Sequence, residues 1–316
     1  MKLKIRQKEV PNLKDPIFIA SWPGMGQVSI DTTKDIIKQL KLKQFAVVDS
    51  EQFFSPHEVD VDNGKIILPL SSAGRFYYKK GTKAGDLIIF IADAQPLAHL
   101  AYEYSNQILD FVKKYDVSKV FTFAAMPTFM GHLKRPRLWV SANDQKLLDG
   151  VVGLGVLKLE GGKISGLNGL FAAVCSRFNI SAACILADIP AYTVQIENPK
   201  ACLAILKFMG KLLGEKFNYS ILERKSKRMD EQVSNFLEYI KETKDMDKIE
   251  EYADNTGEDS TVHNQLPGSA RENIEKLFRE VKIDPSKAAL LKNELDRWNV
   301  YHEYEDRFLD LFKRDN

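Results

Sequence analysis

The sequence predicts an α/β protein: a three-layer α/β/α domain with a mainly parallel sheet, followed by an all-helical C-terminal extension. Three observations lead to this prediction. Up to Leu213, short apolar runs alternate with amphipathic segments, as in a parallel sheet covered by helices. Runs such as DLIIFIAD and KVFTFAAM are apolar on successive residues, which is typical of strands buried on both faces. Beyond Tyr219 the pattern is helical throughout.

The expected strands are short apolar runs, and amphipathic helices are expected between them. We expect strands over residues 17–22, 45–49, 87–92, 119–125 and 182–187, and helices over 28–40, 97–115, 144–151, 170–178 and 199–214. Two stretches interrupt the alternation. Asn63-Gly64 in VDVDNGKIILPL predicts a hairpin turn, and RLWVSAND predicts a further short strand. Insertions of this kind at a sheet edge are expected to form interfaces or site walls.

The charge distribution indicates a change of character near Asn218. Residues 1–218 carry 28 Lys+Arg against 20 Asp+Glu, a net charge of +8, whereas residues 219–316 carry 17 against 23, a net charge of −6. We therefore expect one domain over 1–218 and a helical extension over 219–316, with an acidic linker near 250–270. In the extension we expect amphipathic helices over 225–246 and 271–281 and a long helix from Asp284-Pro285 toward Lys313. This extension could pair with itself, with a partner or with the core of the same chain, and packing on the core of the same chain is the favoured interpretation.

Composition excludes several classes of function. A chain with 44% hydrophobic and 28% charged residues is in the ordinary globular range. No run approaches the roughly 18 to 20 uncharged apolar residues that span a bilayer, and MKLKIRQKEV lacks the apolar part of a secretory signal, so we expect a cytoplasmic protein with no membrane contact. Neither half clusters basic residues with aromatic ones, so we expect no nucleic-acid partner.

Cysteine and histidine spacing predicts neither a metal nor a cofactor. The five histidines form no HxxxH or HExxH pair. The three cysteines lie in apolar surroundings without a CxxC spacing and are expected to be reduced and buried. They are Cys175, Cys184 and Cys202.

The segment SWPGMGQVS directly follows the first expected strand and partly matches a dinucleotide fingerprint. Gly24 and Gly26 fit G-x-G-x-x-G, but Ser29 occupies the third glycine position and Pro23 removes a backbone donor where a phosphate would need one. A structural turn is therefore favoured over cofactor binding. Trp22 is expected at the rim of a cleft or against a partner.

A second glycine-rich segment, EGGKISGLNGL, precedes the fourth expected helix. The GxxxxGK[ST] frame fails because Leu157 stands where its first glycine would be. A helix that begins near Asn168-Gly169 would present free amides to an anion, but glycine for close helix packing is the favoured interpretation. No GxSxG motif is present, and acidic residues such as Asp93 are expected to be solvated, so we predict no catalytic residue.

Taken together, the two glycine segments resemble the proteasome assembly chaperone family, the archaeal and bacterial homologues of the second subunit of the eukaryotic assembly-chaperone heterodimer. The resemblance covers about residues 14–213. Its most specific elements are Trp22-Pro23-Gly24-Met25-Gly26, the segment from Gly166 to Gly169, and the loop from Ala187 to Tyr192 with the helix after it.

The resemblance implies an α/β/α core similar to nucleoside phosphorylases and peptidyl-tRNA hydrolases, without their catalytic residues. Members often self-associate, characterised relatives escort proteasome alpha subunits into rings, and some members carry an ATP-grasp label that no nucleotide motif supports here. The family often docks through a C-terminal hydrophobic residue, a tyrosine and a final residue. This chain ends Lys313-Arg314-Asp315-Asn316 and differs from that pattern.

Two functional hypotheses follow. The first is a non-enzymatic, assembly-chaperone-like protein that self-associates and binds other protein subunits, with proteasome alpha-type subunits as the implied partners. The second is a nucleoside- or phosphate-binding protein or enzyme of phosphorylase-like descent that uses the cleft at the strand carboxyl ends. For either hypothesis the candidate binding residues are Trp22, Pro23, Gly24, Met25, Gly26, Asp93, Pro127, Gly166, Asn168, Gly169 and Tyr192.

Overall fold

The computed structural model describes residues 2–49, 51–54, 60–67, 74–242, 268–283, 287–298, 300, 303–304, 307–308 and 311. The chain divides into two compact units, residues 1–254 and 255–316. The first unit includes the helix that follows Tyr219. The expected boundary of the α/β/α domain at residue 218 remains a prediction. Most of the expected acidic linker near 250–270, and residues 313–316, lie outside the described residues.

The first unit contains a nine-stranded mixed sheet with the order β1-β3-β6-β7-β2-β8-β11-β9-β10. The strands are β1 Lys4–Gln7, β2 Ile17–Ser21, β3 Lys43–Asp49, β6 Gly74–Thr82, β7 Gly85–Ile91, β8 Lys119–Thr128, β9 Leu138–Ala142, β10 Leu157–Lys158 and β11 Ser181–Pro190. The central pairs β7–β2, β2–β8 and β8–β11 are parallel, and so is the short edge pair β9–β10. The pairs β1–β3, β3–β6, β6–β7 and β11–β9 are antiparallel.

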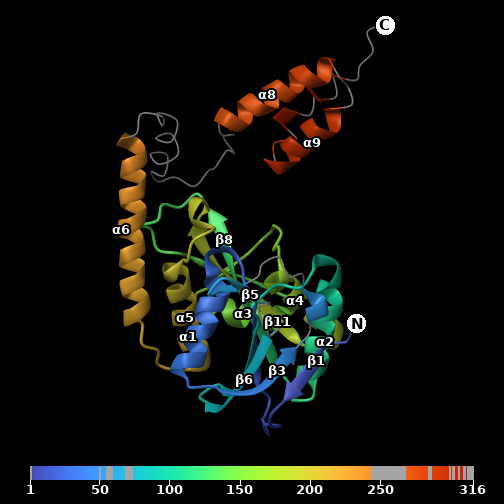
Figure 1. Cartoon of the computed structure of the whole chain (residues 1–316), viewed down its shortest axis with the longest axis vertical. Helices are drawn as coiled ribbons and strands as arrows, with labels where there is room; N and C mark the ends of the chain where they lie inside the picture. Colours follow the sequence, from blue (N-terminus) through green and yellow to red (C-terminus); the bar gives the residue numbers. More distant parts are fainter. Residues whose placement is uncertain are drawn as a thin grey trace. The chain divides into compact units, whose positions relative to one another are not determined.

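Helices cover both faces of this sheet. They are α1 Val28–Gln39, α2 Ala101–Lys113, α3 Gln145–Val152, α4 Leu167–Val174, α5 Pro199–Leu213 and α6 Ser220–Glu242, with short 3-10 helices η1 Met25–Gln27, η2 Glu51–Phe53, η3 Ala98–Leu100, η4 Cys175–Phe178 and η5 Ala191–Thr193. Figure 1 shows α1 and α5 on one side of the strands and α2 on the other. The predicted α/β class with a helical C-terminal region is therefore confirmed.

Strand β2 shows how one sequence supplies two cores. Phe18 and Ala20 point into the core beneath α2 and α4, whereas Ile17 and Ile19 point into the core beneath α1, α3 and α5. This alternation follows from the two-residue period of a strand, and both faces are apolar because both are covered. Burying each large side chain of this kind contributes about 1.5–3 kcal/mol.

The predicted Asn63-Gly64 hairpin is confirmed as a separate two-stranded sheet of β4 Asp60–Asp62 and β5 Lys65–Ile67. Asn63 and Gly64 both adopt the left-handed conformation, with φ of 48° and 77°. This is the geometry that a two-residue turn with the twist of its strands requires.

Helix α6 packs along α5 through Leu222, which belongs to the core beneath α5. Its buried positions include Leu222, Ser226, Met229 and Val233, which recur at the spacing of one helical face. Phe236 of the same helix is 61% exposed and lies outside this buried face.

The second unit has its own small core. Helices α8 Gly268–Ile283 and α9 Ala288–Arg297 bury Ile274, Phe278, Leu291 and Leu295 against one another. The expected long helix toward Lys313 is wrong in extent, because α9 ends at Arg297 and Val300 is not helical.

Candidate functional site

The two glycine segments meet at the carboxyl ends of β2, β8 and β11. The first leads from β2 through η1 into α1, and the second leads into α4. Asn168, in the first turn of α4, joins them: its Oδ1 accepts a hydrogen bond from Trp22 N at 3.0 Å, and its Nδ2 donates to Trp22 O at 3.1 Å. The Asn168 backbone carbonyl also accepts from Thr122 Oγ1 at 2.6 Å. Asn168 therefore ties β2, β8 and α4 together.

Ser29 completes this polar cluster instead of making room for a phosphate. Its hydroxyl lies 2.7 Å from the hydroxyl of Ser21 and donates to Asn168 Oδ1 at 3.3 Å. All three side chains are buried. The residue that departs from the dinucleotide fingerprint is thus used for internal hydrogen bonding.

Gly26 serves a tight turn, as favoured from the sequence. Its φ is 62°, and a Cβ at this position would lie 3.1 Å from Asn198 Cβ. Gly26 N donates to Val194 O at 2.9 Å, and Asn198 N donates to Gly26 O at 2.9 Å. Only glycine adopts this conformation without strain, so the turn holds η1 against the start of α5.

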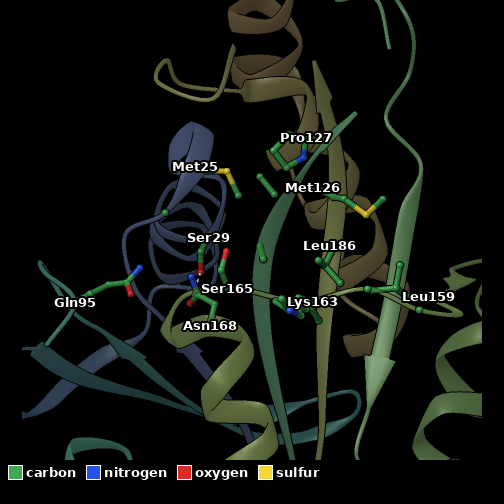
Figure 2. A pocket seen from close by; sticks show the side chains of 16 residues that line it. Met25, Ser29, Gln95, Met126, Pro127, Leu159, Lys163, Ser165, Asn168 and Leu186 are labelled. Atoms are coloured by element: carbon green, nitrogen blue, oxygen red, sulfur yellow. Dashed lines mark hydrogen bonds between the residues drawn. The ribbon is translucent and has the colours of Figure 1, made fainter. Parts of the chain in front are cut away.

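A cavity of about 230 Å³ opens between the two segments, and we call it the carboxyl-edge pocket. Its apolar walls are Met25, Met126, Pro127, Leu159, Ile164 and Leu186, and its polar lining residues are Ser29, Gln95, Lys163, Ser165 and Asn168. The other five lining residues are glycines and alanines. Figure 2 shows that these side chains come from η1 and α1, from the segment after β7, from strands β8 and β11, and from the first turn of α4 with the segment that leads into it.

The candidate residues are only partly brought together. Gly24, Met25, Pro127 and Asn168 line the pocket. Pro23 lies beside it, and its carbonyl accepts a hydrogen bond from Gln95 Nε2 at 2.6 Å.

Gly166 and Gly169 shape the entry into α4. Gly166 precedes the helix with a φ of 83°. Gly169 packs so closely on the preceding loop that a Cβ would lie 2.4 Å from Ile164 Cγ2.

Trp22 lies elsewhere than expected. We expected its ring at a cleft rim or against a partner, but the side chain is fully buried, with ring centroids 4.9 Å from Phe171 and 5.6 Å from Phe90. The alternation along β2 places Trp22 on the same face as Phe18, in the core beneath α2 and α4. Only its backbone contributes to the polar cluster of the site.

Asp93 and Tyr192 do not line the pocket. Asp93, which we expected to be solvated, forms an ion pair with Arg75 at 2.5 Å on the antiparallel side of the sheet. Tyr192 is 55% exposed after β11, and its hydroxyl contacts His132.

His132 organises a second feature that sequence reasoning missed. It lies in the loop 129–135 after β8, which we call the anchored loop. Its backbone N donates to Tyr192 Oη at 2.9 Å, and its Nδ1 lies 3.1 Å from the same oxygen. Its Nε2 lies 2.9 Å from Ser234 Oγ of α6, and its carbonyl accepts from Lys200 Nζ at 2.5 Å. No local motif connects these distant positions, so only the structure reveals them.

The anchored loop presents apolar side chains on a fixed backbone. Phe129 is 77% exposed and Leu133 is 68% exposed, on either side of the anchored His132. Lys200 also forms an ion pair with Asp230 at 2.7 Å, which binds α6 to α5 beneath the loop. Burial lowers the pKa of His132; Asp230 opposes this shift and Lys200 adds to it.

The thiols and titratable groups offer little for catalysis or metal binding. Cys175, Cys184 and Cys202 are buried and unpaired, and burial raises the pKa of the Cys184 thiol to about 11. Across the described positions, no three histidine, cysteine or carboxylate side chains come close enough to hold a metal ion. Within the same residues, no helix combines the length and apolar character needed to cross a membrane.

These features define a class: three-layer α/β/α proteins with a small, mostly apolar cavity at the carboxyl edge of the sheet, between a W-P-G-x-G turn and a glycine-led helix. The chain belongs to the PAC2 family, whose family model matches residues 18–237. This confirms the resemblance to the proteasome assembly chaperone family.

Several known proteins are similar to this chain. An uncharacterized protein of Methanocaldococcus jannaschii is 23% identical over 237 residues, which cover 74% of this chain and 86% of the relative. Among solved structures, PbaB of Pyrococcus furiosus, an archaeal proteasome activator, is 25% identical with a TM-score of 0.64, over 74% of this chain and 98% of that one. PbaA of the same organism, an archaeal homolog of proteasome-assembly chaperone, is 23% identical with a TM-score of 0.59, over 76% of this chain and 98% of that one.

Proposed function

We propose that this protein is a non-enzymatic, assembly-chaperone-like protein that binds other protein subunits, with proteasome alpha-type subunits as its clients. The anchored loop is the observation that carries this proposal. Phe129 and Leu133 are largely exposed, while all four polar atoms of His132 between them are engaged within the protein. Exposed apolar side chains on a preorganised backbone are typical of protein-binding surfaces, because little conformational entropy is lost on binding.

The family supports the choice of client. PbaB is an archaeal proteasome activator, and PbaA is a homolog of proteasome-assembly chaperone. We extend that association to this chain, together with a cytoplasmic location and self-association. The helical region after Tyr219 is proposed to take part in partner binding.

Co-elution of the purified protein with the proteasome alpha subunit of its source organism tests the proposal. The double variant Phe129→Ser/Leu133→Ser is expected to lose co-elution without losing stability, because both side chains are already in solvent. The matched control is Val61→Ser/Ile66→Ser on the β4–β5 hairpin, where the two side chains are 68% and 75% exposed. The control is expected to bind like the unchanged protein.

Two results would argue against this function. One is the absence of a complex between the unchanged protein and the alpha subunit. The other is an equal loss of binding in the two double variants, because exposed apolar area in general would then explain the interaction.

The carboxyl-edge pocket favours a second candidate, a small-molecule binding protein of phosphorylase-like descent. A thermal-shift panel of nucleosides, nucleotides and phosphate tests it, since a ligand at 100 times its dissociation constant stabilises the folded state by about 2.7 kcal/mol. An unchanged unfolding midpoint across the panel would exclude this candidate for those ligands.

A further inference from the structure

We propose that the carboxyl-edge pocket receives the C-terminal end of a partner polypeptide, with the terminal carboxylate at Lys163 and the last, apolar side chain between Met25, Met126 and Leu186. This inference rests on the proposed function, because it names the part of a protein partner that the site receives.

The charge of the pocket selects an anion. Lys163 is the one ionisable side chain among the sixteen lining residues. Lys163 and Ser165 are both exposed at the pocket, and in the part of the chain that the structure describes no carboxylate pairs with Lys163 and no group hydrogen-bonds the Ser165 hydroxyl. One ammonium group and one hydroxyl at the same site match a single carboxylate.

The remaining polar groups of the pocket are already engaged inside the protein. Ser29 and Asn168 are bonded to each other and to β2, as described above. Gln95 donates to Pro23 O and accepts from Leu167 N at 3.1 Å. A sugar or nucleobase needs several convergent donors and acceptors, which these groups do not offer. The walls are mainly apolar, so the ligand is an apolar group with one negative charge.

The size of the pocket limits the ligand further. Sites for drug-sized molecules have volumes of about 300–1,000 Å³. The carboxyl-edge pocket is smaller, at about 230 Å³. It therefore suits one amino-acid side chain with its carboxylate better than a nucleotide.

The surroundings favour a chain end over a free small acid. Met126 and Pro127 line the pocket in β8, and the same chain continues through Thr128 to the exposed Phe129 of the anchored loop. Residues that precede a bound C-terminus would lie against this exposed part of the chain just outside the pocket. A free small acid would fill only the pocket and would make no contact with the exposed Phe129.

Methionine methyl NMR tests the inference at the pocket itself. The full chain has seven methionines, of which Met25 and Met126 line the pocket, while Met209 is a buried residue of α5 outside the pocket and serves as an internal reference. The protein, labelled with ¹³C at its methionine methyls, is titrated with an acetylated pentapeptide of four alanines and a final leucine. The free acid is expected to move the Met25 and Met126 signals and to leave Met209 unchanged.

Removing either charge should weaken binding. The unchanged protein is expected to bind the peptide amide about tenfold more weakly than the free acid, a loss of about 1.4 kcal/mol. The variant Lys163→Gln is expected to bind the free acid more weakly than the unchanged protein by the same factor of about ten. Lys163→Arg is expected to retain binding. Lys146→Gln, at an exposed lysine of α3 outside the pocket, is the matched control and is expected to bind like the unchanged protein.

Three results would overturn the inference: no movement of the Met25 and Met126 signals, equal binding of acid and amide, or acetyl-leucine binding as tightly as the pentapeptide. The last result would assign the pocket to a free small acid. If the alpha subunit co-elutes while the peptides leave both signals unmoved, the proposed function stands and this inference fails. Peptide binding without co-elution supports the pocket's specificity and argues against that client.

Discussion

The side-chain amide of Asn168 pairs with both backbone groups of Trp22, 146 residues away in sequence. This two-bond contact extends the hydrogen bonding of β2 beyond its last ladder residue, Ser21. It holds the W-P-G-M-G turn in register with α4, so the shape of the carboxyl-edge pocket depends on one amide.

Asn168→Ala is expected to destabilise the fold by about 2–4 kcal/mol, because it leaves both backbone groups of Trp22 buried without partners, and each unsatisfied buried group costs about 1–3 kcal/mol. Urea unfolding followed by circular dichroism measures the change. Asn235→Ala, at an exposed position of α6, is the matched control and should shift stability by less than about 0.5 kcal/mol. Equal effects of the two variants would contradict the role assigned to Asn168.

The central strands could be predicted from sequence because burial on both faces leaves a continuous apolar run. Strands β1 and β6 could not, since each lies on the antiparallel side of the sheet and carries exposed charges, such as Lys4 in β1 and Lys80 in β6. With one face less covered, their sequences resemble surface loops. The short β10 is too brief to leave any pattern.

At the site, the sequence indicated which segments matter but not how they meet. The two glycine segments do converge, and the structural interpretation of Gly26 agrees with its left-handed turn. The contact between Asn168 and Trp22 joins residues too distant for any local motif. The burial of Trp22 was accessible, however, because two-residue alternation from Phe18 predicts that it shares the same core.

Gly169→Ala is expected to destabilise the protein by about 1–3 kcal/mol, because the new methyl group would overlap Ile164 in a closely packed region. The comparison is Gly150→Ala in α3, where a Cβ would meet nothing within 4 Å. That variant should stabilise by up to about 1 kcal/mol through helix propensity. Denaturant midpoints of the two variants should therefore move in opposite directions, and a shift in the same direction would refute the packing argument.

His132 should make stability depend on pH. Its folded pKa is lowered from the ordinary value of 6.5, mainly by burial. The unfolded chain therefore binds the proton more readily, so the contribution of neutral His132 is present above about pH 6.5 and is lost as the pH falls through the folded pKa.

The measurement compares thermal midpoints at about pH 7.5 and about pH 5.5 for the unchanged protein and for His132→Gln, which keeps hydrogen-bonding groups without titrating in this range. The unchanged protein should lose more stability on acidification than the variant. Carboxylates that titrate in this range affect both proteins equally, so their contribution drops out of the difference between the two losses. Identical losses would show that His132 does not titrate against the folded state.

The last prediction concerns how α6 is attached to α5. Lys200 Nζ bonds both His132 O and Asp230, and the side chains of Lys200 and Asp230 are only 17% and 21% exposed. Lys200→Met removes the cation and leaves two partly buried acceptors without this donor, so a loss of about 1–3 kcal/mol in stability is expected.

Lys225→Met is the control on α6, because its pair with Glu197 is 3.4 Å long with both side chains more than half exposed. That pair is worth about 0–1 kcal/mol. Amide hydrogen exchange should therefore rise along α6 in Lys200→Met and stay near its original level in Lys225→Met, and equal exchange in both would place the attachment of α6 in its apolar stripe alone.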